Sequence, residues 1–425
     1  MFFVPLTMAY EPRSVNNNLF GIGIINHSDL EDVRNLVNVN GGDWGYVKVV
    51  ITEKQRNKEL WQKFMDDCRK YRLIPIVRIA SEFKESNWEI PNIDNIDSWI
   101  NFFNSLNWVV ENKYIIIGNE PNHAKEWGGT IDPAGYAIYL KTFAERLHNV
   151  NSGYFVINAG FDQDAPNSKN TMDEKKYIEQ MIKKVPDVFD SIDGFASHSY
   201  PNPGFSGSKN GSGRRSIRGY IWELDYLRFL GVNKDFPIFI TETGWLRNKH
   251  NTPEKIADNF VYAYENVWKK DRRVVAVTPF ILNYQNKPFY EFSWKKQDGT
   301  YFTVYDKIRE IKKEKGEPLQ KISGEIIFTF LNPLMVKNSR QNGYVILKNT
   351  GQAIWEQSQS TIKNDIKSEI IVSDLRFENI MPFNRGLVTF SLKAPNESNV
   401  FNVNIGIYVK GVRIGDTYNG KIITF

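Results

Sequence analysis

Short apolar runs alternate eight times with amphipathic stretches between residues 19 and 315, and this alternation constrains the fold more than any other feature. The runs are rich in β-branched residues and bounded by turn formers, as buried strands are, whereas the stretches carry apolar residues at helical spacing. The predicted strands are Leu19–Asn26, Tyr46–Ile51, Leu73–Ala80, Tyr114–Gly118, Tyr154–Ala159, Gly194–Ser199, Phe236–Thr241 and Val274–Asn283. The predicted helices are Asp29–Val39, Gln55–Arg72, Ile96–Glu111, Pro133–Val150, Asp173–Lys184, Ile217–Leu230, Pro253–Lys269 and Val304–Lys315.

Eight units of this kind indicate a parallel sheet whose faces are covered by helices. Eight units in about 300 residues fit a (β/α)8 TIM barrel better than an open doubly wound sheet. A doubly wound fold normally carries a glycine-rich phosphate turn, but Gly21-Ile22-Gly23 lies inside the first predicted strand and lacks the third glycine. We therefore predict an α/β fold, with a TIM barrel at residues 1–318 and no nucleotide site.

The alternation stops at Glu317-Pro318, and short β-type runs separated by turn residues follow. They predict a smaller all-β sandwich of immunoglobulin-like type at residues 319–425. Trp355 resembles the tryptophan that packs between the sheets of such modules, and both a spacer role and a carbohydrate-binding role stay open for this accessory domain. The predicted strands are Glu325–Phe330, Gly343–Lys348, Glu369–Val372, Gly386–Leu392, Phe401–Val409 and Lys421–Phe425.

Two of the eight predicted barrel strands deliver a glutamate at their carboxyl ends. Glu120 follows the fourth strand and Glu242 follows the seventh. In TIM barrels, catalytic groups come from these strand ends, where the βα loops gather. Glycoside hydrolysis needs one carboxylic acid to protonate the leaving oxygen and one carboxylate to attack the sugar or to activate water. The alternative is that each glutamate only caps a helix or pairs with a basic side chain at the rim.

The residues around these glutamates resemble glycoside hydrolase clan A. The resemblance rests on Asn119-Glu120-Pro121, on Thr241-Glu242-Thr243-Gly244-Trp245 and on His198-Ser199-Tyr200, and it covers residues 19–315. It implies a retaining (β/α)8 glycosidase with Glu120 as acid/base and Glu242 as nucleophile. By the same resemblance, Asn119 contacts the sugar 2-hydroxyl, Tyr200 hydrogen-bonds the nucleophile, and His198 lines the same subsite.

This chain also departs from the clan pattern. The clan commonly places an arginine near the nucleophile on the second strand, whereas this chain has Lys48 there. Arg78, on the third strand, is a candidate to supply the guanidinium, and both cations could instead form structural ion pairs. The whole chain matches no single family within the clan, so no substrate identity is implied.

Further candidates lie at the rim of the predicted barrel. Trp245 and Trp294 are candidate platforms for the apolar face of a sugar, although a tryptophan at the base of a loop is often part of the core. Asn26 and Asn283 end the first and eighth strands as candidate substrate contacts. The segments Asn122-His123 and Trp127-Gly128-Gly129 are expected to shape a subsite. The loop 202–219, with Arg214, Arg215 and Arg218, could be a mobile lid, a contact for an extended or anionic glycan, or simply a solvated loop.

Composition narrows the possible partners. The net charge of +5 over 425 residues is too small to indicate nucleic-acid binding, which requires a clustered basic face. The five histidines show no paired ligand spacing, so we expect no metal, and the mechanism implied needs no cofactor. No stretch is long enough to cross a bilayer, and Met1–Tyr10 makes a poor signal peptide. We expect a monomer whose partner is an oligo- or polysaccharide, acting outside the cell after loss of a leader, with a cytoplasmic location still open.

Three functions follow from these observations. The first is a retaining glycosidase acting on a β-linked substrate, in which a competing sugar could replace water and give transglycosylation. The second is an inactive barrel that binds glycans or serves as a cell-surface structural module. The third is a lyase or aldolase, for which Lys48 is the one candidate Schiff-base lysine. The presence of both glutamates together with Asn119 and Tyr200 favours the first.

Overall fold

The computed structural model describes residues 9–425, so most of the apolar opening Met1–Tyr10 lies outside the described part. The chain divides into two compact units, with the boundary between Pro318 and Leu319. Within residues 9–425, none of the helices combines the length and the apolar character needed to span a bilayer.

The first unit is a closed barrel of eight parallel strands. Two sheets form it, with strand orders β1-β2-β3-β6-β7 and β10-β9-β8, and all their strand pairs are parallel. Single bridges, Ile157 to Gly194 and Phe20 to Val277, join the two sheets at both edges, so the barrel closes. The predicted (β/α)8 fold is confirmed. The strands are β1 Gly21–Gly23, β2 Gly45–Thr52, β3 Leu73–Ala80, β6 Lys113–Ile117, β7 Tyr154–Asn158, β8 Phe195–Ser197, β9 Ile238–Ile240 and β10 Val274–Val277.

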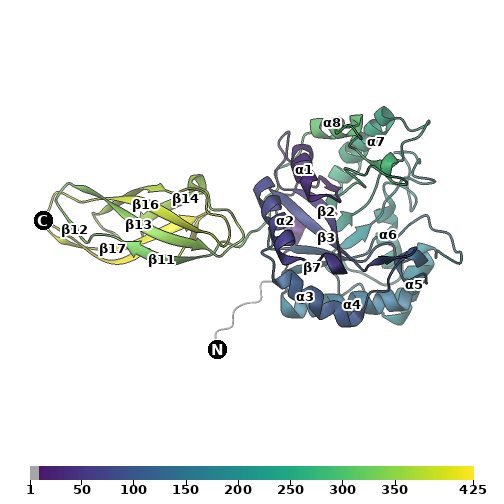
Figure 1. The fold of residues 1–425 in the computed structure, drawn as a ribbon, viewed down its shortest axis with the longest axis horizontal. Helices are drawn as coiled ribbons and strands as arrows, with labels where there is room; N and C mark the ends of the chain where they lie inside the picture. The colour runs from purple at the N-terminus through teal and green to yellow at the C-terminus, as the bar shows by residue number, and fades with distance from the viewer. Residues whose placement is uncertain (1–8) are drawn as a thin grey trace. The chain divides into compact units, whose positions relative to one another are not determined.

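A helix follows each barrel strand, and Figure 1 shows α2, α3 and α4 on the outside of the strands. The amphipathic pattern explains this layer, because each helix buries its apolar face against the sheet and exposes its charged one. The helices are α1 Leu30–Val37, α2 Lys58–Tyr71, α3 Ile96–Asn104, α4 Pro133–Val150, α5 Glu174–Lys184, α6 Gly219–Phe229, α7 Pro253–Asn266 and α8 Thr303–Glu310. Short 3-10 helices are η1 Pro12–Ser14, η2 His27–Asp29, η3 Glu53–Gln55, η4 Ile93–Asn95, η5 Ala124–Glu126, η6 Trp268–Lys270, η7 Tyr290–Phe292 and η8 Gln357–Gln359.

Two features of the barrel differ from the prediction. Helix α3 ends at Asn104 rather than at Glu111, because the following segment turns inward and buries Trp108, whose indole N–H donates to the Phe103 carbonyl at 3.1 Å. A hairpin of two short strands, β4 Phe83–Lys84 and β5 Asn87–Trp88, follows β3 and was not predicted. The hairpin lies on the side of the barrel where β3 ends, whereas α3 ends on the opposite side, where β6 begins.

The second unit consists of two packed sheets. Their strand orders are β11-β13-β16-β15 and β12-β19-β17-β14, with β18 added beside β17. Side chains from both sheets, among them Val345, Phe390 and Ile405, form one core around the fully buried Trp355. The predicted all-β sandwich is therefore present, with β12, β14 and β18 found in addition. The strands are β11 Gly324–Phe330, β12 Leu334–Met335, β13 Arg340–Asn349, β14 Ser360–Asn364, β15 Ile371–Arg376, β16 Arg385–Lys393, β17 Val400–Val409, β18 Val412–Arg413 and β19 Tyr418–Thr424.

A pair of fully buried glutamates lies between α5, α6 and β8. None of their four carboxylate oxygens has a hydrogen-bond partner among the described residues, and the charge of Glu223 acts directly on Glu174. Burial and the neighbouring Glu223 raise the pKa of Glu174 well above its ordinary value of 4.5, while burial raises the pKa of Glu223. Two adjacent buried carboxylates cannot both be ionised cheaply, so at least one of the two groups holds a proton.

This pair makes stability depend on pH. A carboxyl group whose pKa is higher in the folded than in the unfolded chain binds more protons when folded, so it stabilises the fold most at low pH. We expect the melting temperature of the wild type to fall as the pH rises above about 4.5, the ordinary glutamate value. Glu174→Gln keeps the size of the side chain, removes one of the two titrating groups and should flatten that fall. Thermal melts across pH test this, with the exposed Glu314→Gln as control; an unchanged slope in Glu174→Gln would contradict it.

Candidate active site

The two predicted glutamates follow the carboxyl ends of β6 and β9 and face one another across the barrel. Gly118 (φ +92°) and Glu120 (φ +30°) both adopt left-handed backbone conformations, and the second is unusual for a residue with a side chain. The backbone N–H of Glu120 donates to the Gly160 carbonyl after β7 at 3.0 Å. This turn directs the Glu120 side chain toward the end of β8, where His198 lies.

Glu242 is held as a carboxylate by its neighbours. Lys48 Nζ lies 2.7 Å from Glu242 Oε1, and the Tyr200 hydroxyl donates to Oε2 at 3.1 Å. Burial alone would raise the pKa of Glu242, but the positive charges of Lys48, His198 and Arg78 outweigh burial and lower it to about 2. Glu242 is therefore ionised at neutral pH. One of its oxygens accepts a hydrogen bond from the Lys48 ammonium and the other from the Tyr200 hydroxyl.

His198 links the two glutamates. Its Nδ1 lies 2.9 Å from Glu120 Oε1 and 4.0 Å from Glu242 Oε2, and the ring is buried. One oxygen of Glu120, one oxygen of Glu242 and a ring nitrogen of His198 lie within 4.8 Å of one another. In retaining glycosidases the two carboxyl groups are about 5–5.5 Å apart, against about 6.5–9.5 Å in inverting enzymes, so this separation fits retention.

The same trio is also the one group of possible metal ligands found among residues 9–425. Its donor set fits a metal poorly, because the Lys48 ammonium already occupies Glu242 Oε1 and would repel a cation placed beside it. Glu120, His198 and Glu242 are therefore better described as a hydrogen-bonded and ion-paired cluster than as a metal site.

Lys48 is buried and bound to Glu242 rather than free. Burial lowers the pKa of Lys48 from its ordinary 10.5, and the charge of Glu242 acts in the opposite direction. A Schiff-base lysine needs an unpaired amine directed at a carbonyl. The ion pair therefore weakens the lyase or aldolase alternative and gives Lys48 the role of counter-ion to Glu242.

Removing the Lys48 counter-ion should change how kcat/KM depends on pH. In Lys48→Met, the burial of Glu242 is no longer opposed by its nearest cation, so the pKa of Glu242 rises. We expect the acid limb of kcat/KM to move to higher pH by about 1–3 units, the usual effect of one close opposite charge. Kinetics from acidic to neutral pH would measure this, with the exposed Lys54→Met as control. An unmoved acid limb would show that Lys48 does not set the ionisation of Glu242.

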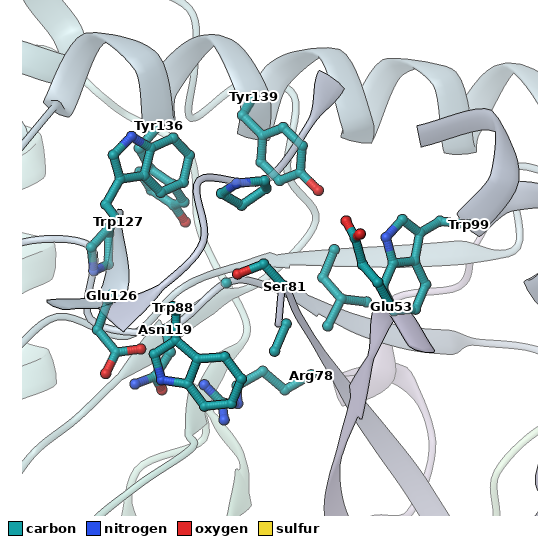
Figure 2. Close-up of a pocket in the computed structure, with 15 residues that line it drawn as sticks. Glu53, Arg78, Ser81, Trp88, Trp99, Asn119, Glu126, Trp127, Tyr136 and Tyr139 are labelled. Carbon is teal, nitrogen blue, oxygen red and sulfur yellow. The ribbon is translucent and has the colours of Figure 1, made fainter. Parts of the chain in front are cut away.

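Asn119 and Arg78 lie beside this cluster and line a small cavity between the ends of β3 and β6 (Figure 2). Trp88 and Glu126 line the same cavity, and the sequence had not suggested either. Trp127 also lines this cavity, and its expected part in a substrate subsite stays a prediction. Burial raises the pKa of Glu126 to about 7; Arg78 opposes this shift and Glu120 adds to it.

Two predicted sugar platforms are wrong. Trp245 and Trp294 are each only 2% exposed, and both pack edge-on against Phe260, with ring centroids 5.0 and 5.1 Å away. The indole N–H of Trp245 donates to the Gly207 carbonyl at 2.9 Å. Both rings therefore belong to the core under the loops and present no face to a ligand.

Neither rim asparagine forms a hydrogen bond to Glu120 or Glu242 that is seen among the described residues. The Asn283 amide donates to both carboxylate oxygens of Asp29, at 3.1 and 3.2 Å, and its oxygen accepts from Gln285 at 2.6 Å. Asn283 thus fastens the start of α1 rather than offering itself to substrate. Asn26 is exposed just before η2, and no hydrogen bond recorded among the described residues joins it to Glu120 or Glu242.

The loop 202–219 is tied down by its arginines. Arg214 pairs with Asp173 and Arg215 with Asp164, each at 2.6 Å, while Arg218 donates to two backbone carbonyls of the loop. These contacts give the three cations structural partners. The hypothesis of a contact for an anionic glycan is therefore not favoured.

No protein-family model matches this chain, and no curated protein matches it. Among solved structures, it is similar to a β-mannanase from Thermomonospora fusca, at 17% identity and a TM-score of 0.45 over 70% of this chain and 92% of that one. A GH128 endo-β-1,3-glucanase from Sorangium cellulosum is similar at 14% identity and a TM-score of 0.45, over 68% of this chain and 97% of that one. Endo-glycoceramidase II from Rhodococcus sp. is similar at 10% identity and a TM-score of 0.42, over 91% of this chain and 99% of that one. Because these identities and TM-scores are low, the similarities carry no activity over to this chain.

Proposed function

We propose that the protein is a retaining glycoside hydrolase that cleaves β-linked oligo- or polysaccharides, with Glu242 as nucleophile and Glu120 as acid/base. The observation that carries this proposal is that two carboxyl groups lie close together and have different partners: Glu242 is paired with Lys48, and Glu120 with His198. Their nearest oxygens lie within 4.8 Å, and Lys48 keeps Glu242 ionised. The resemblance of both strand ends to glycoside hydrolase clan A supports the same assignment.

The proposed reaction has two displacements. A Glu242 oxygen attacks the anomeric carbon while the Glu120 carboxylic acid gives its proton to the leaving oxygen, so a glycosyl ester forms and the aglycone departs as an alcohol. Glu120, now a carboxylate, takes a proton from water, whose oxygen attacks the same carbon and releases Glu242. The net change is addition of one water across the glycosidic bond.

The neighbouring residues support these roles. Tyr200 and Lys48 each hold one oxygen of Glu242 and so fix the plane of the nucleophile. His198 stays within hydrogen-bonding distance of Glu120, and a histidine nitrogen can accept from the acid or donate to the carboxylate according to its protonation state. Asn119, next to Glu120, is the proposed contact of the sugar 2-hydroxyl.

The stereochemistry of the product tests the proposal. A panel of β-linked polysaccharides and aryl β-glycosides is digested, and the anomer first released from an active substrate is observed by proton NMR. We expect the β-anomer, because two inversions restore the starting configuration. Release of the α-anomer would refute the two-step mechanism, and saturable binding without turnover would favour the inactive glycan-binding barrel.

A further inference from the structure

One sheet of the second unit carries basic side chains on its outward face. Strands β13 and β16 pair at the centre of this sheet (Figure 1), and alternate residues of both, such as Val345 and Phe390, enter the core. The residues between them point away from the core, because successive side chains of a strand alternate between its two faces. The basic residues of this outward face, on β13, β15 and β16, are Arg340, Lys348, Arg376, Arg385 and Lys393.

Four of these five cations face one another across the two central strands. Arg340 lies opposite Lys393, and Lys348 lies opposite Arg385. Like charges directly opposite one another destabilise a sheet. Among residues 9–425, the one ion pair found for the five cations joins Arg340 to Asp374 at 3.6 Å. The repulsion is therefore largely uncompensated within the described chain, and an anionic partner would relieve it.

The distribution of charge along the chain agrees with this placement. Residues 319–425 contain twelve Lys and Arg against eight Asp and Glu, so a net charge of +4 out of the total of +5 belongs to the second unit. Three carboxylates, those of Glu325, Asp374 and Glu378, lie on or beside the basic face. Five cations still leave the face positive, and a positive surface attracts anionic partners.

A surface hollow of about 570 Å³ lies beside two of these cations. Arg376 and Arg385 line it together with Leu387, Phe377 and Gln357. Pockets of about 300–1,000 Å³ bind small organic molecules, and a guanidinium matches the two oxygens of a carboxylate. The hollow therefore fits a carboxylate-bearing group of the size of a sugar better than a single small ion.

Exposed apolar side chains occupy the middle of the same face. Phe328, Ile346 and Leu387 form one row across β11, β13 and β16, and Phe330 lies opposite Tyr344 in the next row. The centroids of the Phe330 and Tyr344 rings are 6.4 Å apart, and Phe328, Phe330 and Leu387 are each more than half exposed. Exposed rings of this kind are platforms for the apolar face of a sugar.

The spacing of the cations favours a long ligand. The pairs at Arg340 and Lys348 are eight residues apart along β13, which is about 27 Å at the rise of a strand. Arg376 lies opposite Thr389, and Thr389 lies opposite Tyr344, half-way between the two pairs. A single small anion cannot reach all three positions, whereas a polymer with repeated carboxylates can.

We propose that this face of the second unit binds an acidic polysaccharide built of uronic-acid residues. Its carboxylates pair with the basic side chains, and its sugar rings lie on the exposed rings between them. The face fits a bilayer less well, because its apolar side chains lie between the cations on one sheet and do not project beyond them. A second copy of the chain would place two positive faces against one another. The site goes beyond the proposed function, since it gives the accessory domain a ligand of its own.

Binding to the full chain tests the site. Calorimetry compares polygalacturonate, alginate and hyaluronan, each with its carboxyl-reduced, neutral form. We expect at least one acidic polymer to bind about tenfold or more tightly than its reduced form, the effect of one or two charged hydrogen bonds, and to bind less tightly as salt is added. No binding of any acidic polymer, or equal binding of the acidic and reduced forms, would overturn the proposal.

Variants then locate the binding. Replacing Arg376 and Arg385 together by Met should weaken the acidic polymer about tenfold or more. Lys367→Met with Lys421→Met removes two charges from exposed positions outside the basic face and should leave the affinity unchanged. Tyr344→Ala should weaken binding several-fold, a loss that a purely electrostatic attraction would not show. Equal losses in the two double variants, no loss in Tyr344→Ala, or tighter binding to phosphatidylglycerol vesicles than to the polysaccharides would contradict the assignment.

Discussion

Glu242→Gln is expected to lose turnover of every glycoside that the wild type cleaves, by on the order of 10⁴-fold or more, as when an enzyme loses its nucleophile. An amide oxygen cannot form the ester that the first displacement needs. Steady-state kinetics on the best substrate of the wild type would measure the loss. The affinity for the same glycan should change far less, because the amide keeps the shape of the side chain.

Stability measurements on Glu242→Gln show whether a loss of rate comes from lost chemistry or from lost folding. The amide oxygen of Glu242→Gln can still accept from Lys48, but the buried ammonium loses its counter-charge, so some loss of stability is expected. The melting temperature and the circular dichroism spectrum must therefore be recorded with the kinetics. A folded variant that kept the rate of the wild type would rule out Glu242 as the nucleophile.

Glu120→Ala is expected to lose about 10²–10⁴-fold in kcat/KM on substrates with poor leaving groups, the usual contribution of a general acid. Substrates whose phenolate leaves without protonation, such as dinitrophenyl glycosides, should lose much less in the first displacement. For these, the glycosyl-enzyme should accumulate, since no base remains to activate water.

Azide provides the diagnostic for this second variant. The anion needs no base and fits the space left by the Glu120 side chain, so it should restore turnover and give a β-glycosyl azide as product. His198 contacts Glu120 in the wild type, and His198→Ala is a useful companion that should not be rescued in this way. A loss that is the same for good and poor leaving groups, without azide rescue, would rule out Glu120 as the acid/base.

The arrangement of strands and helices could be predicted because burial leaves a clear pattern. Strand β3 has the predicted bounds Leu73–Ala80, and α4 has the predicted bounds Pro133–Val150. The Asp132 side chain caps the first turn of α4, and Pro133 at the first helical position sets where that helix begins. The end of α3 was mispredicted because Trp108 continues the apolar pattern of the helix. In the structure Trp108 lies after the helix, in a segment that turns inward and buries its ring.

The proximity of the two glutamates could be predicted because each follows the carboxyl end of a barrel strand. Glu120 and Glu242 are placed by the backbone, and the barrel brings strand ends together whatever the loops do. Trp245 and Trp294 were misassigned because position after a strand does not say on which side of the loop a ring packs. Trp88 was missed because its hairpin pairs only two residues on each strand, which is too short for an alternating pattern.

The central claim, that Glu242 becomes covalently bound to the sugar, is tested most directly by trapping the intermediate. The wild type is incubated with a 2-deoxy-2-fluoro glycoside bearing a good leaving group and matching its preferred sugar, and the labelled peptide is sequenced by mass spectrometry. We predict one fluoroglycosyl group per chain, attached to Glu242. A label on Glu120 or on any other residue would contradict this assignment, and so would the absence of any label on an enzyme that hydrolyses the parent glycoside.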